Sequence, residues 1–249
     1  MRWILMTTLL AGTLWGQAPA TPAPAPAPAA VPQPVVDAMT KRLADWPQLS
    51  VYRNADTTLP APAAGEKRVI FYGDSITEAW ARLREQSFPG KPYIWRGISG
   101  QTTPQMLVRF QQDVVHLKPA VVVILAGTND IAGNTGPSTP EMIQDNFESM
   151  IAIAKANNIK VVISSILPAD HYGWKSEMHP AEPIRQMNER LKELSKREGL
   201  VYVDYYAAMA NANGGLDPAL SKDGVHPTPQ GYAIMSLLAE KAIAEALAH

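Results

Sequence analysis

The chain has 249 residues, of which 46% are apolar, and a formal net charge of −1, values typical of a soluble globular protein. A near-neutral charge without a long basic run gives no electrostatic basis for binding nucleic acid. Cysteine is absent, which excludes a disulfide framework, a thiolate nucleophile, a cysteine zinc site and an acylated cysteine.

The amino-terminal twenty residues have the pattern of a secretory signal. Met1-Arg2 is a short positive start, and residues 3–15 form an apolar run. That run is too short to cross a hydrocarbon core of about 30 Å as a helix. Small residues at Ala18 and Ala20 offer cleavage sites. We therefore expect residues 1–20 to be removed on export, leaving a secreted, periplasmic or cell-surface protein without stable membrane insertion. The alternative is an uncleaved anchor.

Residues 21–34 are rich in alternating proline and alanine. Because proline lacks a backbone N–H, this pattern can form neither a helix nor a strand ladder. It predicts an extended, semi-rigid linker, with a mature tail of no particular role as the alternative. The folded domain is expected to occupy residues 35–249.

Five short runs of apolar and β-branched residues predict strands within this domain. The run at 120–126 (AVVVILA) is continuous, as in strands buried on both faces. The other four runs are 68–72, 93–95, 160–166 and 200–204.

Helical patterns with recognisable start signals separate these runs. The predicted helices are 35–46, 103–117, 138–157, 183–198, and a last one from Thr228 towards the end of the chain. Three have start signals: Thr103-Pro104, a capping box at 138–141, and Thr228-Pro229. Two have stop signals, Pro47 after the first helix and Gly199 after the fourth. Strands that alternate with helices predict an α/β fold with a parallel sheet covered on both faces. Functional groups of such sheets gather where the strands end.

Four polar segments lie at or near these predicted strand ends. Ser75 follows the first strand, Gly100 the second and Asn129 the third, while Asp223 and His226 precede the last helix. A serine hydroxyl, an oriented histidine and hydrogen-bond donors are the components of nucleophilic acyl transfer. Each segment alone has an equally good structural explanation, as a helix cap or a turn.

In combination, the four segments resemble the SGNH/GDSL hydrolase family from about residue 68 to the end. The matching strings are Gly73-Asp74-Ser75, Gly100, Gly127-Thr128-Asn129-Asp130 and Asp223-Gly224-Val225-His226. The resemblance implies a flavodoxin-like three-layer α/β/α sandwich with a five-stranded parallel sheet.

The resemblance also implies a mechanism. Ser75 would attack an ester carbonyl, His226 would take its proton, and Asp223 would orient the imidazole. The N–H groups of Ser75 and Gly100 and the side-chain amide of Asn129 would form the oxyanion hole. Neither a metal nor an organic cofactor is implied.

Three details of the match concern neighbouring residues. Ile76 replaces the leucine of the nominal GDSL string, a conservative change. Trp95 stands where many members have asparagine, which puts the contacts around Gly100 in doubt. Asp74 and Asp130 match as well and are expected to have structural roles.

The expected activity is hydrolysis of short acyl esters, such as acetyl groups on carbohydrates. One alternative is lysophospholipase or thioesterase activity on longer acyl chains, and another is a non-catalytic carbohydrate-binding relative. Phosphoryl or sulfuryl ester hydrolysis would need metal ligands or an arginine clamp near the nucleophile, and the sequence offers no convincing cluster of either. His171 and His179 flank Trp174. This pair could bind zinc, but we favour a loop that is solvated or lines the substrate site. The substrate is a small-molecule or polysaccharide ester, and the oligomeric state stays open.

Overall fold

The structure, a computed structural model, describes residues 31–249. The signal predicted over residues 1–20 and most of the linker predicted over residues 21–34 lie outside this range. Within the described range the chain divides into two units, residues 31–41 and 42–249. Helix α1 (Gln33–Ala44) corresponds to the helix predicted at 35–46, and none of its residues is buried.

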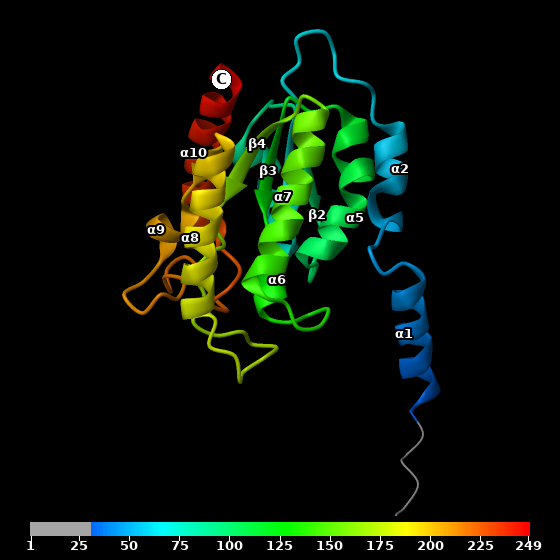
Figure 1. Ribbon diagram of the computed structural model, residues 1–249, viewed down its shortest axis with the longest axis vertical. Coiled ribbons are helices and arrows are strands. Elements are labelled where there is room, and N and C mark those ends of the chain that lie inside the picture. The colour runs from blue at the N-terminus through cyan, green and yellow to red at the C-terminus, as the bar shows by residue number, and fades with distance from the viewer. Residues whose placement is uncertain (1–30) are drawn as a thin grey trace, which may run out of the picture. The chain divides into compact units, whose positions relative to one another are not determined.

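Five parallel strands form the sheet of the second unit, in the order β2-β1-β3-β4-β5 (Figure 1). Their bounds are β1 Val69–Gly73, β2 Tyr93–Gly97, β3 Val121–Leu125, β4 Lys160–Ser164 and β5 Val201–Val203. This strand order is the flavodoxin-like one: β2 is added on one side of β1, and β3, β4 and β5 are added on the other side. The predicted fold class is confirmed.

Helices cover both faces of the sheet, which makes the three layers. One face carries α5 (Thr103–Asp113), α7 (Pro140–Ala156) and α8 (Ala181–Glu198). The other carries α3 (Ser75–Trp80), α9 (Tyr205–Met209) and α10 (Pro229–Ala248). Shorter elements are η1 (Ala81–Leu83), α4 (Arg84–Ser87), η2 (Val115–Leu117) and α6 (Thr128–Ile131). Within residues 31–249, no helix combines the length and apolar composition needed to cross a bilayer.

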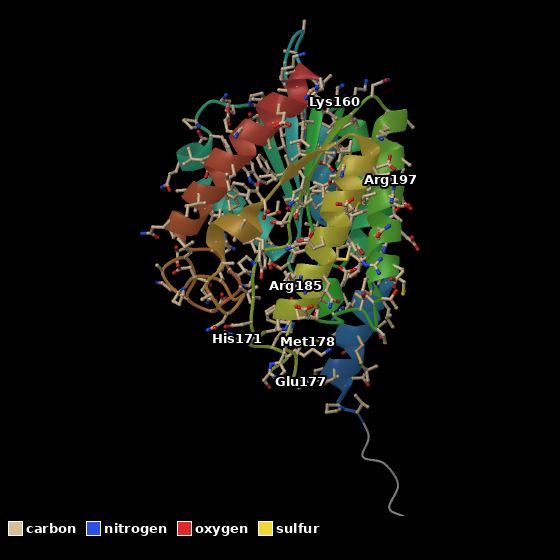
Figure 2. All side chains as sticks on the ribbon, turned by 60° about the vertical axis from the view of Figure 1, so that its left-hand side comes forward. Lys160, His171, Glu177, Met178, Arg185 and Arg197 are labelled. Carbon is tan, nitrogen blue, oxygen red and sulfur yellow. The ribbon has the colours of Figure 1, made fainter. Side chains whose placement is uncertain are left out.

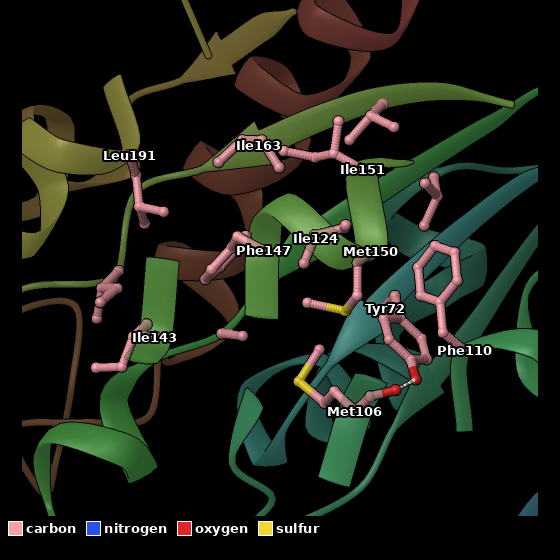
Figure 3. Packing of buried hydrophobic residues seen from close by; sticks show 14 of the residues in the cluster. Tyr72, Met106, Phe110, Ile124, Ile143, Phe147, Met150, Ile151, Ile163 and Leu191 are labelled. Atoms are coloured by element: carbon pink, nitrogen blue, oxygen red, sulfur yellow. Dashed lines mark hydrogen bonds between the residues drawn. The ribbon is translucent and has the colours of Figure 1, made fainter. Parts of the chain in front are cut away.

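The two layers of core follow from the alternation of side chains along each strand. Tyr72 on β1 faces α5, where its hydroxyl donates to the Met106 carbonyl at 2.5 Å (Figure 3). Phe71 faces the opposite layer and stacks on Trp95 with ring centroids 5.2 Å apart. Trp95, the departure from the family pattern, is therefore a core residue.

Two helices begin one residue away from the start that their sequence signals predict: α5 one residue earlier and α7 one residue later. Thr102, rather than Thr103, caps α5, and its N–H donates to Gln105 Oε1 at 3.1 Å. Thr103 instead donates its hydroxyl to Asp130 at 2.6 Å. Similarly, Thr139 caps α7 in place of the capping box expected from residue 138. In α5, the buried carboxylate of Asp130 on α6 accepts from the hydroxyl that local spacing assigns to the cap.

Helix α2 (Ser50–Thr58) occupies a stretch for which the sequence predicts no element. The Asp45 carboxylate accepts from the first N–H groups of this helix, those of Leu49 and Ser50, at 2.8 and 2.9 Å. Tyr52 on α2 donates to the Gly97 carbonyl at 2.5 Å. The helix is polar and short, so tertiary contacts rather than an apolar periodicity stabilise it.

Candidate active site

Ser75 lies in the sharp turn between β1 and α3. The Asp74 carboxylate caps this helix by accepting from the Ile76 N–H at 3.0 Å, so Ser75 is the first helical residue and not the cap. At the end of β2, a Cβ on Gly97 would lie 2.2 Å from the backbone nitrogen of Glu78. Only glycine there allows α3 to sit this close to the sheet, with Ser75 at its edge.

The loop before α10 brings a histidine and an aspartate to Ser75. His226 Nε2 lies 2.9 Å from Ser75 Oγ, and His226 Nδ1 lies 2.7 Å from Asp223 Oδ2. The three side chains thus form a continuous hydrogen-bonded chain that joins residues 151 positions apart in the sequence. With Nδ1 engaged by the carboxylate, Nε2 is the nitrogen available to accept the serine proton.

Asp223 is held in its ionised form by its own loop. Partial burial would raise its pKa, but the His226 and Val225 N–H groups and the imidazole together lower the pKa well below its ordinary value. Asp223 Oδ1 accepts from His226 N at 2.8 Å and Val225 N at 3.0 Å, while Oδ2 faces the ring. The carboxylate therefore stays negative well into the acidic range, and can support a positive charge on the imidazole.

Two backbone N–H groups, those of Ser75 and Gly100, are available to a ligand. Gly100 has a φ of +75°, a left-handed conformation that favours glycine. Glu78 on α3 accepts from the N–H and the hydroxyl of Ser99 at 2.7 and 2.5 Å, which ties this loop to the helix that begins at Ser75. In the described part of the chain, the N–H groups of Ser75 and Gly100 have no protein acceptor.

The Asn129 amide lies between these two loops. Its Nδ2 donates to the Gln101 carbonyl at 3.0 Å and, over a longer 3.3 Å, to Asp74 Oδ2. Asn134 donates to Asn129 Oδ1 at 2.8 Å, which fixes the amide with its nitrogen towards Asp74. A substrate oxygen would accept a hydrogen bond from the Asn129 amide by displacing Asp74 Oδ2, the more distant of the two acceptors. The sequence analysis did not assign Asn134 to the site, because the partner of its side chain is defined only by the folded loop.

The two aspartates of the matched strings are both buried. Burial raises the pKa of Asp74 to about 6, with the Ile76 N–H and the His226 side chain acting against it. Burial likewise raises the pKa of Asp130 to about 6, opposed by the Thr103 hydroxyl and N–H. Each carboxylate organises a helix start: Asp74 that of α3 and Asp130 that of α5. These contacts are structural.

A buried arginine connects the strand ends under the site. Arg109 on α5 is fully buried, and its guanidinium donates to the carbonyls of Gly73 and Arg96 at 2.9 and 3.0 Å. It also donates to Gln101 Oε1 at 2.5 Å and pairs with Asp113 at 2.9 Å. The sequence analysis missed this residue. Its signal is a charged pair with i,i+4 spacing on the apolar face of the predicted helix.

The two histidines that flank Trp174 lie on the loop before α8. His171 Nδ1 lies 2.6 Å from Asp170, and both side chains are more than 40% exposed, as is expected of a solvated loop. Across residues 31–249, no group of three or more histidine, aspartate or glutamate side chains is arranged to hold a metal ion.

Comparison with known proteins identifies the relatives of this chain. Residues 71–234 match the GDSL-like Lipase/Acylhydrolase family. An acetylxylan esterase of Geobacillus stearothermophilus is 28% identical over 202 residues, 70% of this chain and 91% of the relative. Esterase TesA of Pseudomonas aeruginosa is 27% identical over 176 residues, 66% and 81% of the two chains.

A solved structure agrees with the sequence relatives. The crystal structure of a GDSL-like lipase from Bacteroides thetaiotaomicron superposes with a TM-score of 0.78 at 43% identity, covering 81% of this chain and 99% of that one. The region matched by the family, residues 71–234, contains the end of β1, the other four strands and the Ser75, Gly100, Asn129 and Asp223–His226 segments. The chain therefore belongs to the GDSL-like lipase/acylhydrolase family and is a carboxylic ester hydrolase.

Proposed function

We propose that this enzyme hydrolyses short-chain acyl esters, acetyl esters of carbohydrates in particular, with Ser75 as nucleophile, His226 as base and Asp223 as the residue that orients it. The observation that carries the proposal is the hydrogen-bonded chain from Ser75 Oγ through the imidazole to Asp223, with steps of 2.9 and 2.7 Å. Both distances are within the range for proton transfer and for orientation of a general base.

In the acylation half, Ser75 Oγ attacks the ester carbonyl carbon as its proton passes to His226 Nε2. The carbonyl oxygen becomes an oxyanion, for which the Ser75 and Gly100 N–H groups and the Asn129 amide are the donors at hand. The intermediate then collapses, the bond to the alcohol oxygen breaks, and His226 returns the proton to the departing alcohol. Asp223 stabilises the imidazolium while it carries the proton.

In the deacylation half, a water molecule replaces the alcohol. His226 Nε2 removes a proton from the water as its oxygen attacks the acyl-serine carbonyl. Collapse of the second intermediate breaks the bond to Ser75 Oγ, which takes the proton back from the imidazole. The products are a carboxylic acid and the free enzyme, and every group needed for both halves is a side chain or N–H of this chain.

The acetyl and carbohydrate part of the proposal is supported by the acetylxylan esterase relative, which aligns over 91% of its own length. Its name states both the acyl group and the polymer on which that relative acts. The loops at 132–140 and 167–182 would shape the acyl and alcohol sides of the pocket here.

We expect kcat/KM to fall about tenfold or more from p-nitrophenyl acetate to p-nitrophenyl dodecanoate, with the butyrate ester between them. A pocket sized for an acetyl group excludes a long chain sterically, which raises the barrier for that substrate. Initial rates on the three esters measure this, with acetate release from acetylated xylo-oligosaccharides as the direct test of the carbohydrate. A higher kcat/KM for dodecanoate would identify a lysophospholipase or thioesterase instead.

We also propose that the protein is exported, with residues 1–20 removed and residues 21–34 serving as a tether. The support is the sequence pattern of a short positive start, an apolar run and small residues. Intact mass measurement of the protein outside the cytoplasm should give a chain that begins after Ala18 or Ala20. A chain that begins at Met1 in the membrane fraction would contradict export with cleavage and favour an anchor.

A further inference from the structure

Trp174 is the one exposed aromatic side chain among residues 31–249. All the others in that range are buried or half-buried, whereas Trp174 is 50% exposed. It lies on the loop between β4 and α8, on which Figure 2 labels His171, Glu177 and Met178. Single exposed hydrophobic residues are common on protein surfaces, so the way in which this indole is held, rather than its exposure alone, indicates a role.

The loop holds this side chain in one orientation. One face of the indole stacks on the ring of buried Tyr172, with centroids 4.8 Å apart and planes inclined by 21°. The Tyr172 hydroxyl is in turn 2.8 Å from Thr128 Oγ1. The edge of the indole is also engaged, because Nε1 donates to Asn134 Oδ1 at 3.2 Å. The part that remains in solvent is therefore the second face, which is flat and fixed in place.

The Trp174 side chain is connected to the candidate active site through Asn134. Asn134, which accepts from the indole, also donates to Asn129 Oδ1 at 2.8 Å and to the Gly100 carbonyl at 3.4 Å. Asn134 therefore links Trp174 to Asn129 and Gly100, the residues of two of the three proposed oxyanion donors. Three residues before Trp174 on the same loop, His171 packs against Gly224, where a Cβ would lie 2.6 Å from the imidazole. The loop spans the site from the oxyanion donors to the Asp223–His226 turn.

We propose that the free face of Trp174 is a stacking platform for a pyranose ring on the alcohol side of the scissile ester. The proposal rests on the esterase function proposed above and names the subsite that would select a carbohydrate ester. The C–H groups on one face of a pyranose carry partial positive charge and meet the negative face of an indole, while its hydroxyls stay in water.

The surroundings favour a sugar over an acyl chain. An acyl chain binds in a concave apolar pocket, whereas the exposed neighbours of Trp174 on this loop are polar or glycine. These neighbours are Asp170, His171, Gly173, Ser176, Glu177 and His179. A flat aromatic face with a polar rim is complementary to a ring that is apolar on its faces and hydroxylated at its edges.

Steady-state kinetics on two substrates tests the platform. On acetylated xylo-oligosaccharides, Trp174→Ala is expected to raise KM about tenfold with kcat within about twofold, because a stacking contact outside the reacting bonds contributes equally to ground and transition states. On p-nitrophenyl acetate, which has no sugar, kcat/KM should stay within about twofold of wild type. Trp174→Phe keeps an aromatic face and should restore most of the affinity for the oligosaccharide.

Leu237→Ala on α10 is the matched control, since Leu237 is 75% exposed and lies in none of the loops at the site. It should change neither substrate. Trp174→Leu keeps an apolar cover over Tyr172 and takes the place of the alanine variant if that variant does not fold.

Three results would overturn the platform. An equal loss on both substrates would assign Trp174 to positioning Asn134 and Asn129, and no loss on either would leave it without a role in binding. A wild-type enzyme that cleaves p-nitrophenyl acetate but not the oligosaccharide would refute the carbohydrate substrate and the platform together, while the esterase activity stands. Titration calorimetry of the oligosaccharide into Ser75→Ala protein, with and without Trp174→Ala, should show the same tenfold difference in Kd.

Discussion

Replacement of Ser75 by alanine is expected to lower kcat for p-nitrophenyl acetate by about five to six orders of magnitude, as when the serine of a comparable triad is removed. The hydroxyl supplies the attacking oxygen, and among residues 31–249 no other side chain is hydrogen-bonded to His226 Nε2 to replace it. Covalent labelling by a fluorophosphonate should disappear as well, as mass spectrometry of the intact protein would show.

The fold should survive this change, because the half-buried Ser75 hydroxyl makes one side-chain contact, with the imidazole. Thermal unfolding by circular dichroism measures this, and Ser149→Ala, which alters an exposed serine on α7, is the control. Full turnover by Ser75→Ala combined with its loss in Ser99→Ala would show that the nucleophile is misassigned.

The other residues of the site should give a graded series in the same assay. His226→Ala should approach the loss of Ser75→Ala, since a serine hydroxyl without a base is a poor nucleophile. Asn129→Ala should cost about 10²–10³ in turnover, the usual effect of removing one oxyanion donor. Asp223→Asn should also be milder than Ser75→Ala, because the imidazole remains but loses its charge support. The losses should not add, since all four residues act on one transition state.

Replacement of Arg109 by alanine is expected to lower the free energy of unfolding by about 3–5 kcal/mol, the cost of removing one partner from a buried ion pair. Arg109 and Asp113 have side-chain exposures of 0% and 1% and lie 2.9 Å apart. The variant leaves the Asp113 charge buried with less compensation. It also removes the donor to the Gly73 and Arg96 carbonyls at the strand ends.

Urea denaturation followed by circular dichroism measures the Arg109 effect. Arg185→Ala is the matched control, because Arg185 makes a comparable ion pair with Glu182 on the exposed face of α8. Exposed pairs of this kind contribute little to stability, so this variant should unfold close to wild type. Equal midpoints for the two arginine variants would contradict the role given to the buried cation.

The sequence was sufficient for the sheet and for the segments of the site. Strands of a parallel sheet are covered on both faces, so each must be an apolar run, and the run at 120–126 predicts β3 within one residue at each end. Helices alternate with these runs and begin near proline-containing signals. The Ser75, Gly100, Asn129 and Asp223–His226 segments could be recognised because each has a characteristic spacing over a few neighbouring residues.

Only the tertiary structure decided how these segments are held and what surrounds them. Helix α2 depends on Tyr52 reaching Gly97, and the cap of α5 shifts because Asp130 takes the hydroxyl of Thr103. Such partners lie 27 and 45 positions apart, and contacts of that kind leave no local periodicity.

Contacts between residues far apart in the sequence also explain why the sequence analysis did not identify the roles of Arg109, Asn134 and Trp174. Arg109 reaches Gly73 across 36 positions, and Asn134 joins Trp174 to Asn129 across 40 and 5. A tryptophan in a sequence is most often part of a core, and Trp95 and Trp80 are buried here. Trp174 differs because its loop offers one face to Tyr172 and leaves the other in water, an arrangement that composition and spacing do not encode.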